Sequence, residues 1–248
     1  MAKLVQKSGY IKSGKASGYM RYIATREGVE KLAGNGSVTK GQRELIQKLL
    51  TDFPDAVELF EYEDYCKTPT LGTASAFISM ALDANLHEID SESGYMQYIA
   101  TRPRAQKRGI HGLFSSATAV DLASAISELE AHEGNVWTII YSLRREDADR
   151  LEYDNADAWR ALLMENAPTL AKSMKISLDN FHWYAAFHDE GHHPHIHMMV
   201  WSDDPKEGFL TKDGIAAMRS KLTNAIFRDE MQQIYERKDV AYSDLVEA

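Results

Sequence analysis

The sequence predicts an α+β fold, because its strand-like segments lie near both ends of the chain with blocks of helix between them. Residues 3–11 read as a weak strand, whereas residues 135–143, 181–188 and 195–201 are rich in β-branched and aromatic side chains. Much of the stretch between the first two segments has apolar residues at helical spacing. Strands that do not alternate regularly with helices favour α+β over a doubly wound parallel sheet.

The first half of the chain is expected to be mostly helical after its opening strand. Residues 18–32 read as a helix, followed by a glycine-containing turn. Thr39 and Gln42 have the spacing of a capping box, in which each side chain bonds the backbone of the other, so a second helix is expected to begin there. A further helix is expected over residues 73–84.

The second half is expected to combine helices with the remaining strands. A helix is predicted from about residue 116 to residue 132, directly before the strand at 135–143. Helices are predicted over much of 144–174, with an interruption near Pro168, because proline lacks the backbone N–H that a helix interior uses. The last helix is expected to begin near Thr211.

Composition places the chain among globular proteins. Of its 248 residues, 44% are hydrophobic and 26% are charged, which excludes a disordered or collagen-like chain. The single cysteine, Cys66, excludes a disulfide framework and a cysteine-based zinc site. Residues 1–20 lack the apolar core of a secretory signal, and no apolar run reaches the roughly 18–20 residues of a membrane span. We therefore expect a cytoplasmic protein without membrane insertion.

Charge is spread unevenly along the chain. The net charge of −9 excludes a uniformly basic surface, but residues 1–31 hold seven lysines and arginines against two acidic residues. Residues 51–66 hold six acidic residues and no basic one. This asymmetry predicts one anion-binding side on an acidic body, with an ordinary solvated surface as the alternative. A second basic cluster consists of Arg102, Arg104, Lys107 and Arg108.

One nine-residue segment occurs twice. Residues 18–26 read GYMRYIATR and residues 94–102 read GYMQYIATR, identical at eight of nine positions. Each copy places two tyrosines three residues apart, on one face of a helix, with an arginine one turn after the second tyrosine. The repeat is either a pair of functional segments or a duplicated packing element.

Histidines are concentrated in one short segment. Six of the nine histidines lie within residues 182–197. His195 and His197 point to the same face of a strand, because strand side chains alternate. If residues 189–194 close a hairpin, His188 lies opposite His195 and the three imidazoles converge. Three neutral imidazoles leave open positions on a divalent ion, which is the catalytic rather than the structural arrangement.

The other histidines of this segment, and the apolar residues between the ligands, are expected to have structural or surface roles. His182 shares their face but lies far from the turn, so we expect it to pack or to line the cleft. His192 and His193 fall in the turn, where exposure is expected, although either side chain is able to contact a phosphate. The opposite face of the second strand is expected to be core, and it carries Ile196, Met198 and Val200.

A tyrosine in the basic N-terminal segment is a candidate nucleophile. Tyr22 follows the first strand directly, and cations such as Arg21 and Arg26 would favour its phenolate and bind a phosphate. A divalent ion would polarise the scissile phosphodiester. Together these groups describe a transesterification that forms a phosphotyrosine and keeps the bond energy for religation.

The order of these features resembles a known enzyme family. A strand, a tyrosine-bearing helix and then the spacing of His188, His195 and His197 resemble the conjugative relaxases of the His-hydrophobic-His endonuclease superfamily. Several longer segments resemble the MobL-type relaxases of mobile elements in Gram-positive bacteria. These segments are YIATREGVEKL, FEYEDY, GNVWTIIYSLRREDA, WYAAFHDEGHHPHIHMMVWSDDPKEGFLTKDGI and IFRDEMQQIY.

The resemblance implies a fold and an activity. It implies a central antiparallel sheet flanked by helices over residues 1–248, with a helical insertion at about 35–92. It implies nicking of one strand at an origin of transfer, covalent attachment to the 5′ phosphate, and Mn²⁺ or Mg²⁺ on the three histidines. The implied partners are origin DNA in single-stranded or hairpin form, a type IV secretion coupling protein and accessory transfer proteins.

The identity of the nucleophile stays open among three tyrosines. The family's pattern of a tyrosine, an apolar residue and an arginine four positions after the tyrosine fits Tyr22 and Tyr98 equally. Position after the first strand favours Tyr22. Tyr19 shares its helical face and is either a second nucleophile or a stacking group.

Three other functions fit part of the pattern. A rolling-circle replication initiator of the same superfamily would make the same nick at a different origin. The order His193, His195, His197 also fits a histidine-triad nucleotide hydrolase or transferase, which would use the middle histidine without metal. A metal-stabilised DNA-binding module without enzymatic activity is the third alternative.

Overall fold

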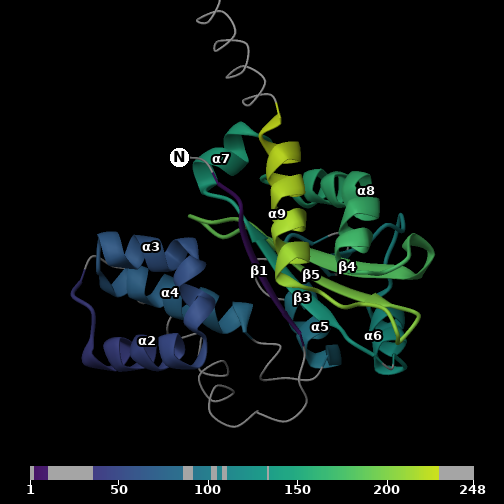
Figure 1. Cartoon of the computed structure of the whole chain (residues 1–248). Coiled ribbons are helices and arrows are strands. Elements are labelled where there is room, and N and C mark those ends of the chain that lie inside the picture. Colours follow the sequence, from purple (N-terminus) through teal and green to yellow (C-terminus); the bar gives the residue numbers. More distant parts are fainter. Residues whose placement is uncertain are drawn as a thin grey trace, which may run out of the picture.

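The computed structural model describes residues 3–10, 36–85, 92–101, 105–107, 111–132 and 134–228. Within these residues, five strands form one sheet in the order β1-β3-β5-β4-β2, and each neighbouring pair is antiparallel (Figure 1). This arrangement confirms the α+β class and the central antiparallel sheet. The strands are β1 (Val5–Tyr10), β2 (Leu113–Phe114), β3 (Trp137–Ser142), β4 (Phe181–His188) and β5 (His195–Ser202).

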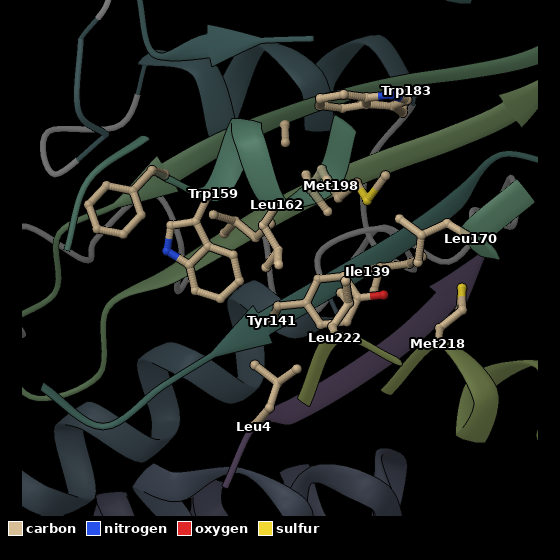
Figure 2. Close-up of a cluster of buried hydrophobic side chains, with 14 of the residues drawn as sticks. Leu4, Ile139, Tyr141, Trp159, Leu162, Leu170, Trp183, Met198, Met218 and Leu222 are labelled. Carbon is tan, nitrogen blue, oxygen red and sulfur yellow. The ribbon is translucent and has the colours of Figure 1, made fainter. Parts of the chain in front are cut away.

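One face of the sheet packs against helices from the C-terminal half. α8 (Ala156–Ser173) and α9 (Lys212–Ile226) lie across this face, and α7 (Arg145–Arg150) follows β3 directly (Figure 1). The core between them contains Trp159 and Met218 from the helices, each fully buried (Figure 2). Burying one such side chain stabilises the fold by about 1.5–3 kcal/mol. The sheet contributes the predicted core residues Ile196, Met198 and Val200.

Two separate groups of helices cover the other face. The first group joins α2 (Lys40–Asp52), the 3₁₀ helix η3 (Pro54–Glu58), α3 (Phe60–Lys67) and α4 (Leu71–Ala84), and it contacts β3 through Ile140. The second group joins α5 (Glu92–Thr101) and α6 (Leu122–Glu130), which pack over β4 and β5. The short 3₁₀ helix η5 (Leu178–Asn180) leads into β4. The predicted histidine cluster lies on this face.

Local sequence signals explain where several helices begin. The capping box at Thr39 is present, with the Gln42 backbone N–H donating to the Thr39 hydroxyl over 3.1 Å. Thr211 caps α9 by accepting from the Gly214 backbone N–H over 3.1 Å, which confirms the predicted start of the last helix. The helix predicted over 18–32 lies outside the described residues.

Two predicted helix features are wrong. α6 begins at Leu122 rather than at about 116, because Asp121 caps it and the Arg160 side chain binds the carbonyl oxygens of Ser115 and Ser116 instead. Pro168 does not interrupt its helix, since α8 runs unbroken around it. The buried side chains of α8 outweigh the roughly 3 kcal/mol that an interior proline costs. In the described part of the chain, no helix is long and apolar enough to cross a membrane.

Candidate metal centre

The β4–β5 hairpin brings the three predicted histidines together. The register pairs His188 directly with His195, and His197 lies one pleat along the same face, opposite Ala186. The ring centroids are 5.3 Å apart for His188 and His195, 4.5 Å for His188 and His197, and 5.0 Å for His195 and His197. One nitrogen from each ring lies within 4.8 Å of the other two. All three side chains are buried.

Backbone carbonyls fix the proton on two of these rings. His188 Nε2 lies 2.9 Å from the carbonyl oxygen of Ile99, so Nε2 carries the proton and Nδ1 the lone pair. His195 Nδ1 lies 3.0 Å from the carbonyl oxygen of His193, so here Nε2 carries the lone pair. A ligand histidine in a metal site usually donates its second nitrogen to such an oxygen. The donor set therefore fits a divalent ion with open coordination positions.

The second copy of the repeated segment, residues 94–102, provides the carbonyl oxygen of Ile99 that binds His188. Tyr98 and Ile99 belong to α5, and the chain after this helix runs alongside the end of β4. There the Gln106 backbone N–H donates to the Phe187 carbonyl oxygen over 2.8 Å. This copy therefore lies next to the histidine cluster.

The turn of the hairpin is fastened by Arg145. Its Nη2 contacts the Glu190 carbonyl oxygen at 2.6 Å and also the Asp189 carboxylate, and its Nε donates to the Gly191 carbonyl oxygen over 3.2 Å. Its backbone N–H donates to the His192 carbonyl oxygen over 2.9 Å. These bonds hold residues 189–192 against the start of α7.

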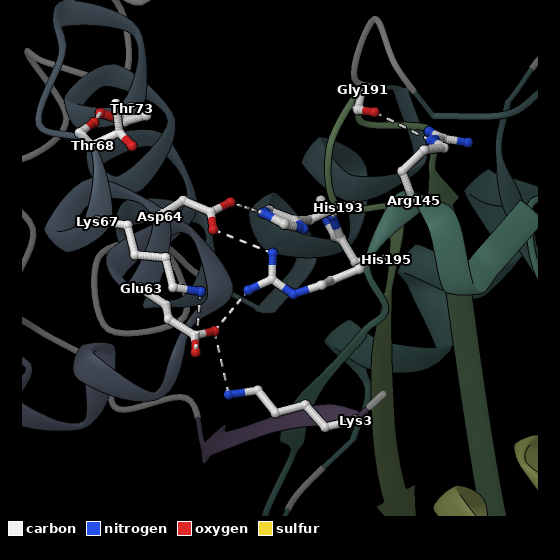
Figure 3. A network of polar contacts seen from close by, with 11 residues as sticks. Lys3, Glu63, Asp64, Lys67, Thr68, Thr73, Arg145, Gly191, His193 and His195 are labelled. Carbon is white, nitrogen blue, oxygen red and sulfur yellow. Dashed lines mark hydrogen bonds and ion pairs between the residues drawn. The ribbon is translucent and has the colours of Figure 1, made fainter. Parts of the chain in front are cut away.

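His193 is buried, so the predicted exposure of this turn residue is wrong. It is only 4% exposed, and its Nε2–H donates to Asp64 Oδ2 over 2.7 Å (Figure 3). Its ring stacks on Phe60, with centroids 5.2 Å apart. Burial lowers the pKa of His193 to about 4 against the opposing effect of Asp64, so the ring is neutral at pH 7. The His193 side chain thus faces α3 rather than His188, His195 and His197, which argues against a histidine-triad arrangement.

Arg144 joins α3 to the end of β3. Its guanidinium donates to Glu63 Oε2 over 2.8 Å and to Asp64 Oδ1 over 3.2 Å, and it lies over the Phe60 ring. Burial alone would raise the pKa of Asp64, but the hydrogen bonds from His193 and Arg144 hold it below its usual value. Within the acidic segment 51–66, Glu63 and Asp64 therefore contact the end of β3 and the hairpin turn.

A comparison with known families identifies the chain. The family model described as MobL relaxases matches residues 1–248. The chain belongs to the MobL relaxase family. This membership confirms the resemblance and implies a DNA-nicking role at an origin of transfer, with binding of that DNA. No curated protein and no solved structure matches the chain.

The other predicted site residues of the relaxase are only partly described. Lys107 is exposed, close to the turn end of β4. Tyr98 lies in α5, but its side chain is outside the described part. The remaining candidates lie outside the described residues, and they are Tyr19, Arg21, Tyr22, Arg26, Arg102, Arg104 and Arg108.

One buried acid of the relaxase was not predicted. Glu61, in α3, is 7% exposed, and its pKa is raised to about 8, chiefly by burial and to a smaller extent by the nearby charges of Asp64, Glu190 and Asp83. Its carboxyl group is therefore mostly protonated at pH 7. A glutamate in a charge-rich helix gives no sequence signal of burial.

Proposed function

We propose that this relaxase nicks one strand at its origin of transfer by metal-assisted tyrosine transesterification and remains bound to the 5′ phosphate. The observation that carries the proposal is the convergence of His188, His195 and His197 on one face of adjacent strands. Membership of the MobL relaxase family supports the nicking role. The proposed cofactor is a divalent cation, Mn²⁺ or Mg²⁺.

The three histidines would hold the cation, which would polarise the scissile phosphate and stabilise charge on its oxygens. Tyr22 is the proposed nucleophile, with Tyr19 beside it and Tyr98 as the alternative. The tyrosine oxygen forms a bond to phosphorus, and the bond from phosphorus to the 3′ oxygen breaks. The tyrosine loses its proton, and the departing 3′ oxygen takes one up.

Basic side chains are the proposed DNA contacts. Arg21 and Arg26 would bind the phosphate next to the nucleophile, because guanidinium groups pair with phosphate in a bidentate manner. The single-stranded or hairpin origin would also contact the cluster of Arg102, Arg104, Lys107 and Arg108. We further propose that residues 1–248 act as one cytoplasmic nicking domain, in which residues from about 35 to 92 form a helical insertion. The proposed protein partners are a type IV secretion coupling protein and accessory transfer proteins.

An adduct assay tests the proposal and the choice of nucleophile. Each variant is incubated with a single-stranded origin oligonucleotide and Mn²⁺ and is then run on a denaturing gel. Tyr22→Phe keeps the ring, so DNA binding should survive while the covalent adduct disappears; Tyr98→Phe should still form it. An adduct from Tyr22→Phe but not from Tyr98→Phe would transfer the role to the second copy. No adduct from the parent protein under any of these conditions would contradict the mechanism.

A further inference from the structure

We propose that His193 and Asp64 are positioning residues for the metal ligand His195, so that helix α3 sets the affinity of the site for a divalent cation. The inference rests on the metal site proposed above, and it concerns residues that do not touch the cation themselves. Three links connect α3 to the ligand.

The first link is the carbonyl oxygen of His193, which accepts the Nδ1–H of His195 over 3.0 Å. The neighbouring carbonyl oxygens, those of His192 and Pro194, accept instead from the backbone N–H groups of Arg145 and Leu143. Of these three consecutive carbonyls, only that of His193 is directed to a ligand ring. The orientation of the His195 ring therefore depends on where the His193 peptide lies.

The second link is the His193 side chain, which fixes that peptide in place. Its Nε2–H donates to Asp64 over 2.7 Å, and its ring stacks on Phe60 at an angle of 24°. Both partners belong to α3, and the His193 side chain is 95% buried between them and the hairpin. A hydrogen bond to a charged group is among the stronger ones in proteins.

The third link is the anchoring of Asp64 from its other side. Oδ2 accepts from His193 while Oδ1 accepts from Arg144, which also binds Glu63 (Figure 3). Arg144 directly follows Leu143, whose N–H binds the turn, so the same stretch of chain holds both α3 and the hairpin. The carboxylate is thus fixed between two donors and is not free to follow His193.

The same hairpin supplies a matched control at its other end. His182 Nε2 lies 2.7 Å from Asp203 Oδ2, the same pairing at the same distance as His193 with Asp64. His182 stacks on Trp201 rather than lying next to a ligand histidine. Breaking this pair removes a histidine–carboxylate hydrogen bond of the same length, at a more exposed position, without touching the proposed site.

Calorimetric titration of the full chain with Mn²⁺ tests the proposal. Asp64→Ala should weaken Mn²⁺ binding by about 10–100-fold, the usual effect of losing an outer partner of a metal ligand. Asp203→Ala should bind Mn²⁺ close to the parent value, because His182 does not lie next to a ligand histidine. His193→Phe keeps the stacked ring but loses the donor, so it should reproduce the loss even if Asp64→Ala fails to fold.

Co²⁺ absorption provides a readout that general destabilisation does not move. A change of ligand geometry in folded Asp64→Ala or His193→Phe should shift the visible bands of bound Co²⁺, whereas Asp203→Ala should keep the parent spectrum. Parent-like affinity and spectrum in both of the first two variants would overturn the positioning role. Failure of the parent protein to bind Mn²⁺ or Co²⁺ would instead overturn the metal site itself, and the positioning role with it.

Discussion

The two ends of the β4–β5 hairpin carry the same residue type in different surroundings. At the turn end, His188 and His195 oppose each other, so their rings meet in a buried cluster. At the open end, His182 opposes Trp201, stacks on the indole and pairs with carboxylates, and its side chain is 34% exposed. The difference shows that a high local number of histidines is not enough for a metal site. The strand register must place the rings on one face, and helices must cover them, before the rings converge as possible ligands.

Loss of one ligand at the turn end should have the largest effect. His195→Ala or His197→Ala should abolish cleavage of origin DNA and remove the proposed divalent-ion site, because only two of the three imidazole ligands would remain. His182→Ala at the open end should leave Mn²⁺ affinity unchanged. Calorimetry measures both, and circular dichroism checks that each variant is folded. Unchanged Mn²⁺ affinity in both His195→Ala and His197→Ala would contradict the ligand assignment.

Removal of the second basic cluster should have a smaller but clear effect. Replacing Arg102, Arg104, Lys107 and Arg108 together by glutamine should weaken origin binding and reduce its dependence on salt, by about 0.7 in the slope for each lost contact with single-stranded DNA. Lys206→Gln, at the open end, should leave the slope unchanged. A parent-like slope in the fourfold variant would make that cluster ordinary solvated surface.

The free energy of unfolding should depend on pH in opposite directions through Glu61, near the turn end of the hairpin, and Glu207, near its open end. The pKa of Glu61 is about 8 in the folded protein against an ordinary 4.5, so the folded state retains a proton that the unfolded chain releases. This group therefore makes the free energy of unfolding fall as pH rises from about 4.5 to about 8. Glu61→Gln keeps a neutral group of similar shape and should raise the free energy of unfolding at neutral pH by about 1–3 kcal/mol.

The opposite sign is expected for Glu207. Its pKa is lowered, chiefly by the hydrogen bond from the Ser202 hydroxyl, so its carboxylate stabilises the folded state above the unfolded-state pKa. Glu207→Gln should therefore lower the midpoint of urea unfolding at pH 7, whereas Glu61→Gln raises it. Shifts of the same sign in both variants would contradict the assigned environments.

The same contrast explains how much of the relaxase could be predicted from its sequence. Strand alternation and hairpin pairing are local rules, and they correctly placed His188 opposite His195. Capping is local too, so Thr39 and Thr211 marked their helices correctly.

Features that depend on packing between distant segments could not be read in this way. Burial of His193 requires Asp64, which is 129 positions away in the sequence. Pro168 lies within an unbroken helix because α8 packs on the sheet. Helix propensities describe only the local sequence, so they do not include the stabilisation that this packing provides.

The most direct test of the central claim is an anomalous diffraction map from crystals grown with Mn²⁺. The account predicts a single protein-bound peak between the three rings, coordinated by Nδ1 of His188, Nε2 of His195 and one nitrogen of His197. That choice of nitrogens follows from the carbonyl oxygens that bind the opposite side of the first two rings. A peak elsewhere in the protein, or none at saturating Mn²⁺, would contradict it.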